Sequence, residues 1–179
     1  MNNIEKFRKI KAFVFDVDGV LCNQHIFVFE NGQVMRQLHQ KDLTALRIAK
    51  EQGYEIAIIS GGNLGHIAPT FKEMGITNIF HLSRDKKADY LEFIDLYDLK
   101  DTEVLYMGDD LPDYQVMRRV GMPACPKTAV PEVKDIALYV SPYEGGEGCV
   151  RDVIEKVLRI NRKWLVEDVS KKKTNKHNS

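Results

Sequence analysis

Short apolar segments bounded by turn residues alternate with longer amphipathic segments along this chain, and this alternation limits its fold more than any other feature. Strands that are apolar throughout are buried on both faces, which is typical of a parallel sheet with crossover helices. The segments of this kind are residues 11–15, 55–59, 78–81, 103–107, 122–125 and, more weakly, 138–140. The sequence therefore predicts an α/β fold with a mainly parallel sheet.

Helices are predicted between these strands, because the intervening segments are amphipathic and several of them end at glycine. Glycine just past the last turn is a common stop signal, since it adopts the left-handed conformation without strain. Gly53, Gly75 and Gly121 occupy such positions. The predicted helices are residues 42–52, 64–74, 86–97, 112–120 and 150–160.

A β-hairpin is predicted outside this alternation, at about residues 25–38. Asn31 and Gly32 separate two short apolar segments, residues 26–30 and 34–38. Asn-Gly favours a two-residue loop in which both residues have positive φ. We interpret the hairpin as a flap beside the first strand, with an extension of the sheet edge as the alternative.

Length and charge exclude several classes of protein. The 179 residues favour a single domain, which we place at residues 1–169. The net charge is zero, but basic residues gather after Ile160, so residues 170–179 are predicted to form a disordered basic tail behind a mildly acidic body. Such a body lacks the basic surface that binds nucleic acid, and no segment has the roughly 18 apolar residues of a membrane span.

The cysteines are three in number and far apart, at Cys22, Cys125 and Cys149. They fit neither a disulfide framework nor a zinc site, and this usage is typical of a reducing compartment. The N-terminal residues are polar and lack the apolar region of a secretory signal. We therefore predict a cytoplasmic protein without nucleic-acid or membrane partners.

Polar residues follow the carboxyl ends of the predicted strands. Asp16 and Asp18 leave the first strand on the same side because they are two positions apart. The others are Ser60, Gly61, Gly62, Lys86, Asp109, Asp110 and Asp113. In open α/β sheets ligands bind beyond the carboxyl ends of the strands, so we expect these residues to share one crevice.

These residue types in one crevice predict phosphoryl transfer with Mg²⁺. Asp16 and Asp109 offer the hard oxygen ligands that Mg²⁺ binds together with water and phosphate oxygens. Asp16 would attack phosphorus, and Asp18 would protonate the leaving alkoxide and later deprotonate the attacking water. Asp110 and Asp113 would cap the following helix or orient the metal, and the two roles are compatible.

The remaining residues would hold the phosphate. The Ser60 hydroxyl, the backbone N–H groups near Gly61 and Gly62, and the Lys86 ammonium could bind its oxygens and offset developing charge. Each feature is weak alone, because a Ser-Gly-Gly sequence is most often a plain turn and a lone lysine a solvated surface charge. The prediction depends on their occurring together.

The four motifs, in this order, resemble those of the haloacid dehalogenase superfamily. They are Asp16-Val17-Asp18-Gly19, Ser60-Gly61, Lys86, and Gly108-Asp109-Asp110 with Asp113. The hairpin, the short chain and the segment GGEGCVR at residues 145–151 resemble the capless 3-deoxy-D-manno-octulosonate 8-phosphate phosphatases. The likeness covers about residues 10–160.

The resemblance implies a Rossmann-like three-layer sandwich without a cap domain, and hydrolysis of a lipopolysaccharide precursor through an aspartyl phosphate. It implies Asp16 as nucleophile and Asp18 as acid–base and backbone metal ligand. It also implies Asp109 as metal ligand and Lys86 as phosphate partner. In that family such a chain is a homotetramer whose neighbouring subunits help to close each active site.

The chain departs from the family where substrate is bound. Many relatives have arginine at the position of Gly62, and some have arginine at that of Glu147. Relatives also tend to have Asn-x-Arg-Asp-Gly where this chain has His-Gln-Lys-Asp-Leu, at residues 39–43. These changes leave the phosphoryl-transfer residues in place but bear on the sugar. The predicted leaving-group contacts are His39, Lys41, Asp42 and Arg47.

Alternative functions remain open. The substrate could be a nonulosonate 9-phosphate, derived from KDN or N-acetylneuraminate. A signalling receiver also combines acidic residues and a lysine around Mg²⁺, but its phosphoacceptor follows the third strand, whereas Asp16 follows the first. A non-catalytic scaffold is disfavoured because the acidic residues and Lys86 are all retained.

Overall fold

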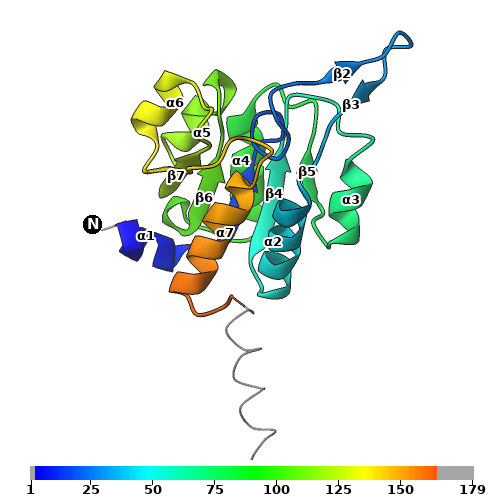
Figure 1. The fold of residues 1–179 in the computed structure, drawn as a ribbon. Helices are drawn as coiled ribbons and strands as arrows, with labels where there is room; N and C mark the ends of the chain where they lie inside the picture. The colour runs from blue at the N-terminus through cyan, green and yellow to red at the C-terminus, as the bar shows by residue number, and fades with distance from the viewer. Residues whose placement is uncertain (1–2, 165–179) are drawn as a thin grey trace, which may run out of the picture.

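Six strands form one parallel sheet in the computed structural model, which describes residues 3–164 (Figure 1). Their order across the sheet is β5-β4-β1-β6-β7-β8. Their bounds are β1 (Ala12–Phe15), β4 (Glu55–Ile59), β5 (Asn78–Phe80), β6 (Val104–Met107), β7 (Met122–Cys125) and β8 (Tyr139–Val140). The predicted fold class, an α/β three-layer sandwich with a mainly parallel sheet, is confirmed. The predicted basic tail lies outside the described residues, and the predicted limits of the domain stay a prediction.

Helices cover both faces of this sheet (Figure 1). One layer holds α1 (Asn3–Lys9), α2 (Gln40–Glu51), α3 (Ala68–Glu73) and α7 (Cys149–Ile160). The other holds α4 (Lys86–Leu96), α5 (Tyr114–Met117) and α6 (Pro131–Ile136). None of the helices within residues 3–164 has the length and apolar character required to cross a bilayer.

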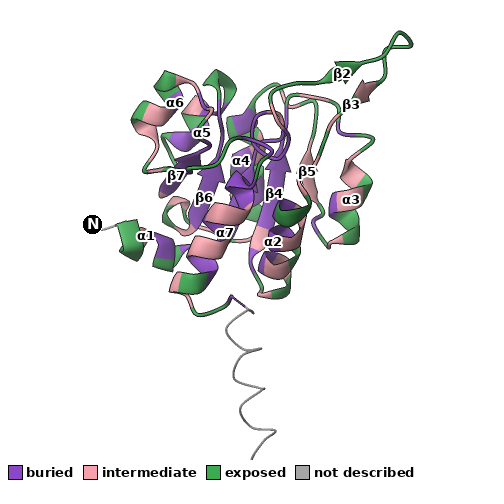
Figure 2. Cartoon of the chain, viewed as in Figure 1, coloured by how far each residue is buried: buried purple, intermediate pink, exposed green. Residues whose placement is uncertain are grey.

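The central strand β1 shows why the sheet is buried on both faces. Phe13 and Phe15 belong to the core beneath α2 and α7, whereas Ala12 and Val14 belong to the core on the opposite face. All four are fully buried. Figure 2 shows that buried residues, in purple, gather in the interior between the helices. Because successive side chains of a strand point to opposite faces, such a strand must be apolar at every position.

Two helices were not predicted from the sequence. Helix α1 buries a single apolar side chain, Phe7, which packs edge-on against Tyr139 with ring centroids 5.7 Å apart. Helix α6 is six residues long and buries only Val133. A short helix with one buried residue gives no periodic apolar pattern, so the sequence carries little signal for it.

The helix predicted at 112–120 is shorter than expected. A 3-10 turn, η2 (Leu111–Asp113), precedes α5, and a second, η1 (Asp101–Glu103), precedes β6. The Asp110 side chain accepts a hydrogen bond from the Leu111 N–H, and Asp113 receives the Asp110 N–H, which favours a tight first turn. The helix predicted from residue 64 likewise begins later, at Ala68.

The hairpin consists of β2 (Phe27–Val28) and β3 (Val34–Met35), and it forms a separate antiparallel sheet that extends from the body (Figure 1). This agrees with a flap and not with an extension of the main sheet. The predicted two-residue loop is wrong. Phe29 donates its N–H to the Gln33 carbonyl, and Gly32 alone in the loop has positive φ. A three-residue loop needs only one left-handed residue, which glycine provides.

The sheet order fixes the place of the crevice. Strand β1 lies between β4 and β6, and the chain builds the sheet outward from β1 first on the β4 side and then on the β6 side. This reversal makes the carboxyl ends of β1, β4 and β6 the point at which an open α/β sheet binds ligands.

Candidate active site

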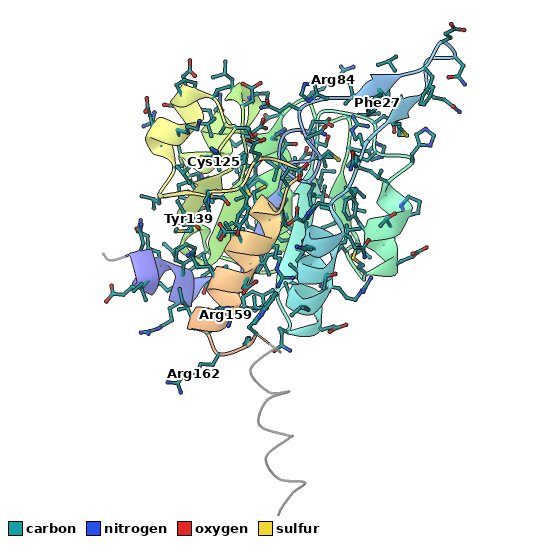
Figure 3. The ribbon with its side chains drawn as sticks, viewed as in Figure 1. Phe27, Arg84, Cys125, Tyr139, Arg159 and Arg162 are labelled. Atoms are coloured by element: carbon teal, nitrogen blue, oxygen red, sulfur yellow. The ribbon has the colours of Figure 1, made fainter. Side chains whose placement is uncertain are left out.

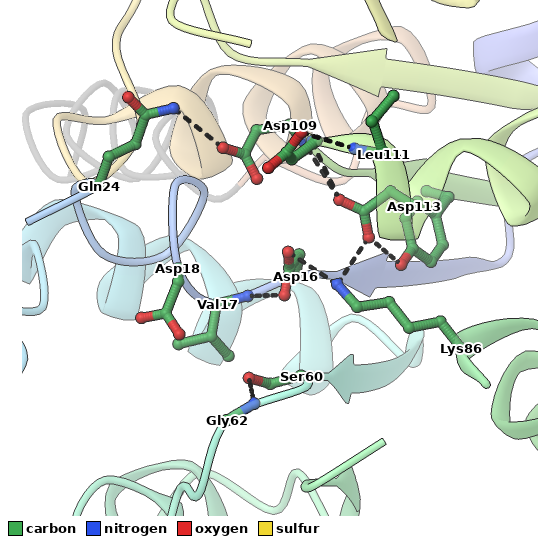
Figure 4. A network of polar contacts seen from close by, with 12 residues as sticks. Asp16, Val17, Asp18, Gln24, Ser60, Gly62, Lys86, Asp109, Leu111 and Asp113 are labelled. Atoms are coloured by element: carbon green, nitrogen blue, oxygen red, sulfur yellow. Dashed lines mark hydrogen bonds and ion pairs between the residues drawn. The ribbon is translucent and has the colours of Figure 1, made fainter. Parts of the chain in front are cut away.

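A cavity of about 790 Å³ opens at the carboxyl ends of β1, β4 and β6. The predicted residues that line it are Asp16, Asp18, Ser60, Gly61, Gly62, Lys86, Asp109 and Asp110. Tertiary folding thus gathers side chains that are separated by more than ninety positions in the sequence. Figure 4 shows how the polar residues among them lie.

Asp16 is held by an ion pair at the base of this cavity. Its Oδ2 atom lies 2.8 Å from the Lys86 ammonium, and its Oδ1 atom accepts the Val17 N–H at 2.6 Å. Burial, followed by the nearby charge of Asp113, raises the pKa of Asp16 from 3.8 to about 8. In the absence of a cation, this carboxyl group therefore binds a proton far more readily than an exposed aspartate does.

Lys86 bridges two carboxylates. Its ammonium lies 2.8 Å from Asp16 Oδ2 and 2.8 Å from Asp113 Oδ1. Burial acts to lower the pKa of Lys86, but the charges of Asp113 and Asp16 outweigh it and raise the pKa above its usual value. Lys86 is therefore a fixed positive charge beside the candidate nucleophile.

Asp113 holds the Lys86 ammonium and the backbone of Asp109 in place through hydrogen bonds. Its fully buried carboxylate accepts the Tyr106 hydroxyl at 2.7 Å, the Lys86 ammonium at 2.8 Å and the Asp109 N–H at 3.0 Å. The neighbouring Gly108 makes room for it, since a Cβ there would lie 2.4 Å from the Asp113 Cβ. This network fits the predicted orienting role of Asp113.

The carboxylates can hold a divalent cation. Asp16, Asp109 and Asp113 each place one oxygen within 4.8 Å of the others. When all three carboxylates are ionised, they and the Lys86 ammonium carry a net charge of −2, which Mg²⁺ would neutralise, and hard oxygens are the ligands that Mg²⁺ prefers. Burial also raises the pKa of Asp109 to about 6, so the ionised form of this carboxyl group is disfavoured unless positive charge compensates it.

Gly19 explains the glycine of the first motif. Its φ is +86°, and a Cβ there would lie 1.9 Å from Asp109 Oδ2. The residue must therefore adopt a left-handed conformation and also allow Asp109 to approach the backbone, and glycine alone satisfies both. Gln24, which the sequence analysis did not select, donates its amide N–H to the same Asp109 oxygen at 3.1 Å.

The Asp18 side chain points away from this cluster. Both of its oxygens bind the Arg36 guanidinium, with Nε–Oδ1 at 2.7 Å and Nη2–Oδ2 at 3.0 Å. Its carboxylate is therefore not one of the three clustered oxygens, and the predicted roles of Asp18, as acid–base and as backbone metal ligand, stay predictions. An acid–base role requires this pair to open first, because the guanidinium occupies both oxygens.

The loop predicted to bind phosphate is held by an internal hydrogen bond. Ser60 is buried, and its Oγ accepts the Gly62 N–H at 3.0 Å. The hydroxyl thus keeps its own hydrogen to donate to a phosphate oxygen. Asp110 caps η2 by accepting the Leu111 N–H at 2.7 Å, so the capping alternative describes its side chain.

The predicted leaving-group contacts do not line this cavity of the single chain, and their role in binding stays a prediction. His39 and Lys41 line a separate cavity of about 370 Å³ beside α7, and Arg47 is exposed on α2. The Asp42 carboxylate accepts the Arg151 N–H at 2.7 Å. It caps the first turn of α7, where the N-cap residue, glycine, has no side chain to do so.

Three contributors escaped the sequence analysis: Gln24, Arg36 and Tyr106. Tyr106 left a weak signal, since it places a hydroxyl in an otherwise apolar, fully buried strand. Gln24 and Arg36 flank the hairpin, and no local pattern shows that the base of the hairpin lies beside Asp18 and Asp109.

Known proteins share this architecture. Residues 25–121 match the model of the haloacid dehalogenase-like hydrolases. The 3-deoxy-D-manno-octulosonate 8-phosphate phosphatase of Escherichia coli K12 is 30% identical over 155 residues, which cover 87% of this chain and 82% of that protein.

Solved structures agree in fold. The crystal structure of the same phosphatase from Yersinia pestis has a TM-score of 0.87 at 29% identity and covers 89% of this chain and 86% of that one. The Moraxella catarrhalis phosphatase, in complex with a magnesium ion, a phosphate ion and a KDO molecule, has a TM-score of 0.89 at 27% identity, with coverages of 95% and 98%.

Proposed function

Because the chain belongs to the haloacid dehalogenase-like hydrolase family, we propose that it is a Mg²⁺-dependent phosphatase whose substrate is 3-deoxy-D-manno-octulosonate 8-phosphate. The observation that carries the chemistry is the cluster of Asp16, Asp109 and Asp113 around Lys86 at the carboxyl end of β1. The observation that carries the substrate is the similarity to phosphatases of that name over most of the chain.

The reaction proceeds in two displacements at phosphorus. An oxygen of Asp16 forms a bond to phosphorus while the bond from phosphorus to the ester oxygen breaks, and Asp18 gives that oxygen a proton. Water then attacks the phospho-aspartate, Asp18 takes its proton, and phosphate and the Asp16 carboxylate are released. Lys86 and the Ser60 hydroxyl hold the phosphate oxygens throughout.

The same geometry supports a metal site in this cluster. Asp16 and Asp109 would hold Mg²⁺, with Asp113 adjacent to them. Bound there, Mg²⁺ supplies positive charge against the phosphoryl oxygens. Because the cluster carries two excess negative charges, it needs a bound cation more than a single carboxylate would.

We expect purified protein to release phosphate from 3-deoxy-D-manno-octulosonate 8-phosphate when Mg²⁺ is present, and to stop when EDTA removes it. A phosphate-release assay across sugar-acid phosphates measures both. Faster turnover of a nonulosonate 9-phosphate would reassign the substrate but keep the mechanism. A stable phosphoprotein without turnover would instead support the receiver alternative, and no reaction at all would support a scaffold.

We further propose that the enzyme acts as a homotetramer. The hairpin carries apolar side chains into solvent, including Phe27 (58% exposed, Figure 3) and Val28 (65% exposed). Apolar patches of this kind are typical of subunit contacts, and a site without a cap needs another element to exclude water. Native mass spectrometry should show four chains, and a fully active monomer would contradict the proposal.

The enzyme is proposed to work in the cytoplasm. All three cysteines are free and buried, which suits a reducing compartment. Cell fractionation with an antibody against the protein tests this assignment, and recovery from a secreted or periplasmic fraction would refute it.

A further inference from the structure

Arg36 leaves the hairpin just after β3 and reaches the rim of the active-site cavity. Its side chain is only 10% exposed, and it forms the two-point ion pair with Asp18 described above. Its third nitrogen, Nη1, donates to the Asn63 carbonyl at 3.0 Å. The guanidinium is therefore anchored at one end to the loop after β4, and its fork is directed at a carboxylate.

Gly62 makes this position possible. A Cβ at residue 62 would lie 2.6 Å from Arg36 Nη2, which is closer than real contacts allow. Gly62 does not have positive φ, so its backbone would accept another residue, and the space is what restricts it. The Arg36 guanidinium therefore occupies space that a side chain at residue 62 would take.

Arg36 also lies at the boundary between two cavities. Asp18 and Gly62, on one side of it, line the active-site cavity of about 790 Å³. Arg36 itself lines a second cavity of about 360 Å³ between the hairpin and the segment before α3, where Asn63 and His66 provide polar groups. This second cavity is referred to below as the hairpin cavity.

We propose that Arg36 binds the carboxylate of the leaving group, which extends into the hairpin cavity, and that the substrate thereby replaces Asp18 on the guanidinium. The inference rests on the proposed function, since it requires a phosphate ester that also carries a carboxylate. A guanidinium fork matches a carboxylate at two points, so one carboxylate can take the place of the other. The exchange frees both Asp18 oxygens to reach the departing ester oxygen.

A purely structural role for Arg36 predicts a different pattern. If the arginine only fastens the hairpin, its loss should lower stability or change the turnover of every ester alike. If it binds the leaving-group carboxylate, its loss should raise KM for esters that have this group and leave KM for other esters nearly unchanged. The split between substrates therefore distinguishes the two roles.

The test compares Arg36→Met with wild type on 3-deoxy-D-manno-octulosonate 8-phosphate and on p-nitrophenyl phosphate, which has no carboxylate. We expect KM for the sugar acid to rise about 10- to 100-fold, the range for a lost charged hydrogen-bonding partner. KM for p-nitrophenyl phosphate should change less than about threefold. Arg36→Lys should restore part of the loss, because the charge returns without the fork.

Gly62→Ala tests the same site while leaving the arginine at residue 36 in the sequence. The added methyl group displaces the guanidinium, so KM for the sugar acid should rise as in Arg36→Met. The double variant should be no worse than Arg36→Met alone, because both changes remove one interaction. Gln37→Met, at an exposed position next to Arg36, is the matched control and should leave both substrates unchanged.

The possible failures can be told apart. A wild-type protein that hydrolyses neither ester would overturn the proposed function, and this inference with it. A wild-type enzyme that prefers the sugar acid, combined with an Arg36→Met variant that keeps that preference, would overturn the inference alone. Equal losses of kcat on both esters would assign Arg36 to holding Asp18 or the hairpin instead.

Discussion

Asp16→Asn is expected to abolish phosphatase activity, with kcat falling on the order of 10⁴-fold or more, as in other enzymes that lose a nucleophile. The amide cannot attack phosphorus, and the cluster also loses one of its three carboxylates. Steady-state phosphate release measures the loss. Borohydride trapping of the wild-type phospho-aspartate, followed by peptide mass spectrometry, should place the modification on residue 16.

Asp98→Asn is the matched control for this substitution. Asp98 is exposed and has a φ of +49°, a conformation that asparagine tolerates well. Asp98 lies outside the active-site cavity, so the activity of the Asp98→Asn variant should equal that of wild type. Turnover in Asp16→Asn within tenfold of wild type, or a trapped phosphate on another residue, would show that the nucleophile has been misassigned.

The metal-free protein is expected to lose stability as the pH rises from about 4 to about 8, owing to Asp16. Its pKa is raised from 3.8 to about 8 in the folded protein, chiefly by burial. Between these values the folded state keeps a proton that the unfolded state has released, so the contribution is greatest below pH 4 and is lost toward pH 8. Each unit of pKa difference corresponds to about 1.4 kcal/mol.

Asp109 contributes with the same sign over a narrower range, because its pKa is raised to about 6. Urea unfolding in EDTA at several pH values measures the effect, as the difference in unfolding free energy between wild type and Asp16→Asn. The unfolding free energy of wild type should fall relative to that of Asp16→Asn as the pH rises. Mg²⁺ should largely remove this effect. An unchanged difference across this range would show that Asp16 is not desolvated as the structure indicates.

Local sequence patterns were sufficient for the strands and most of the helices. Strand β4 has the predicted bounds, residues 55–59. A strand that is buried on both faces needs a continuous apolar segment, and such a segment is visible in the sequence. Helices α1 and α6 escaped, since a helix with one buried side chain has no periodic pattern. Asn31-Gly32 correctly predicted the hairpin but not its loop type. In the structure only Gly32 has positive φ, and the sequence does not show how many loop residues adopt this conformation.

The sequence by itself determined the reacting groups of this protein. A carboxylate at the end of an apolar strand must emerge at the edge of the sheet, so Asp16 and Asp109 could be placed together from their positions alone. Only the tertiary structure decided which groups surround them. Arg36 reaches Asp18, and Asp42 caps the first turn of α7, because these contacts depend on how separate elements pack. Packing partners distant in the chain leave no mark on local composition, and this is why the clustered carboxylates could be predicted from the sequence and the groups that pair with Asp18 and Asp42 could not.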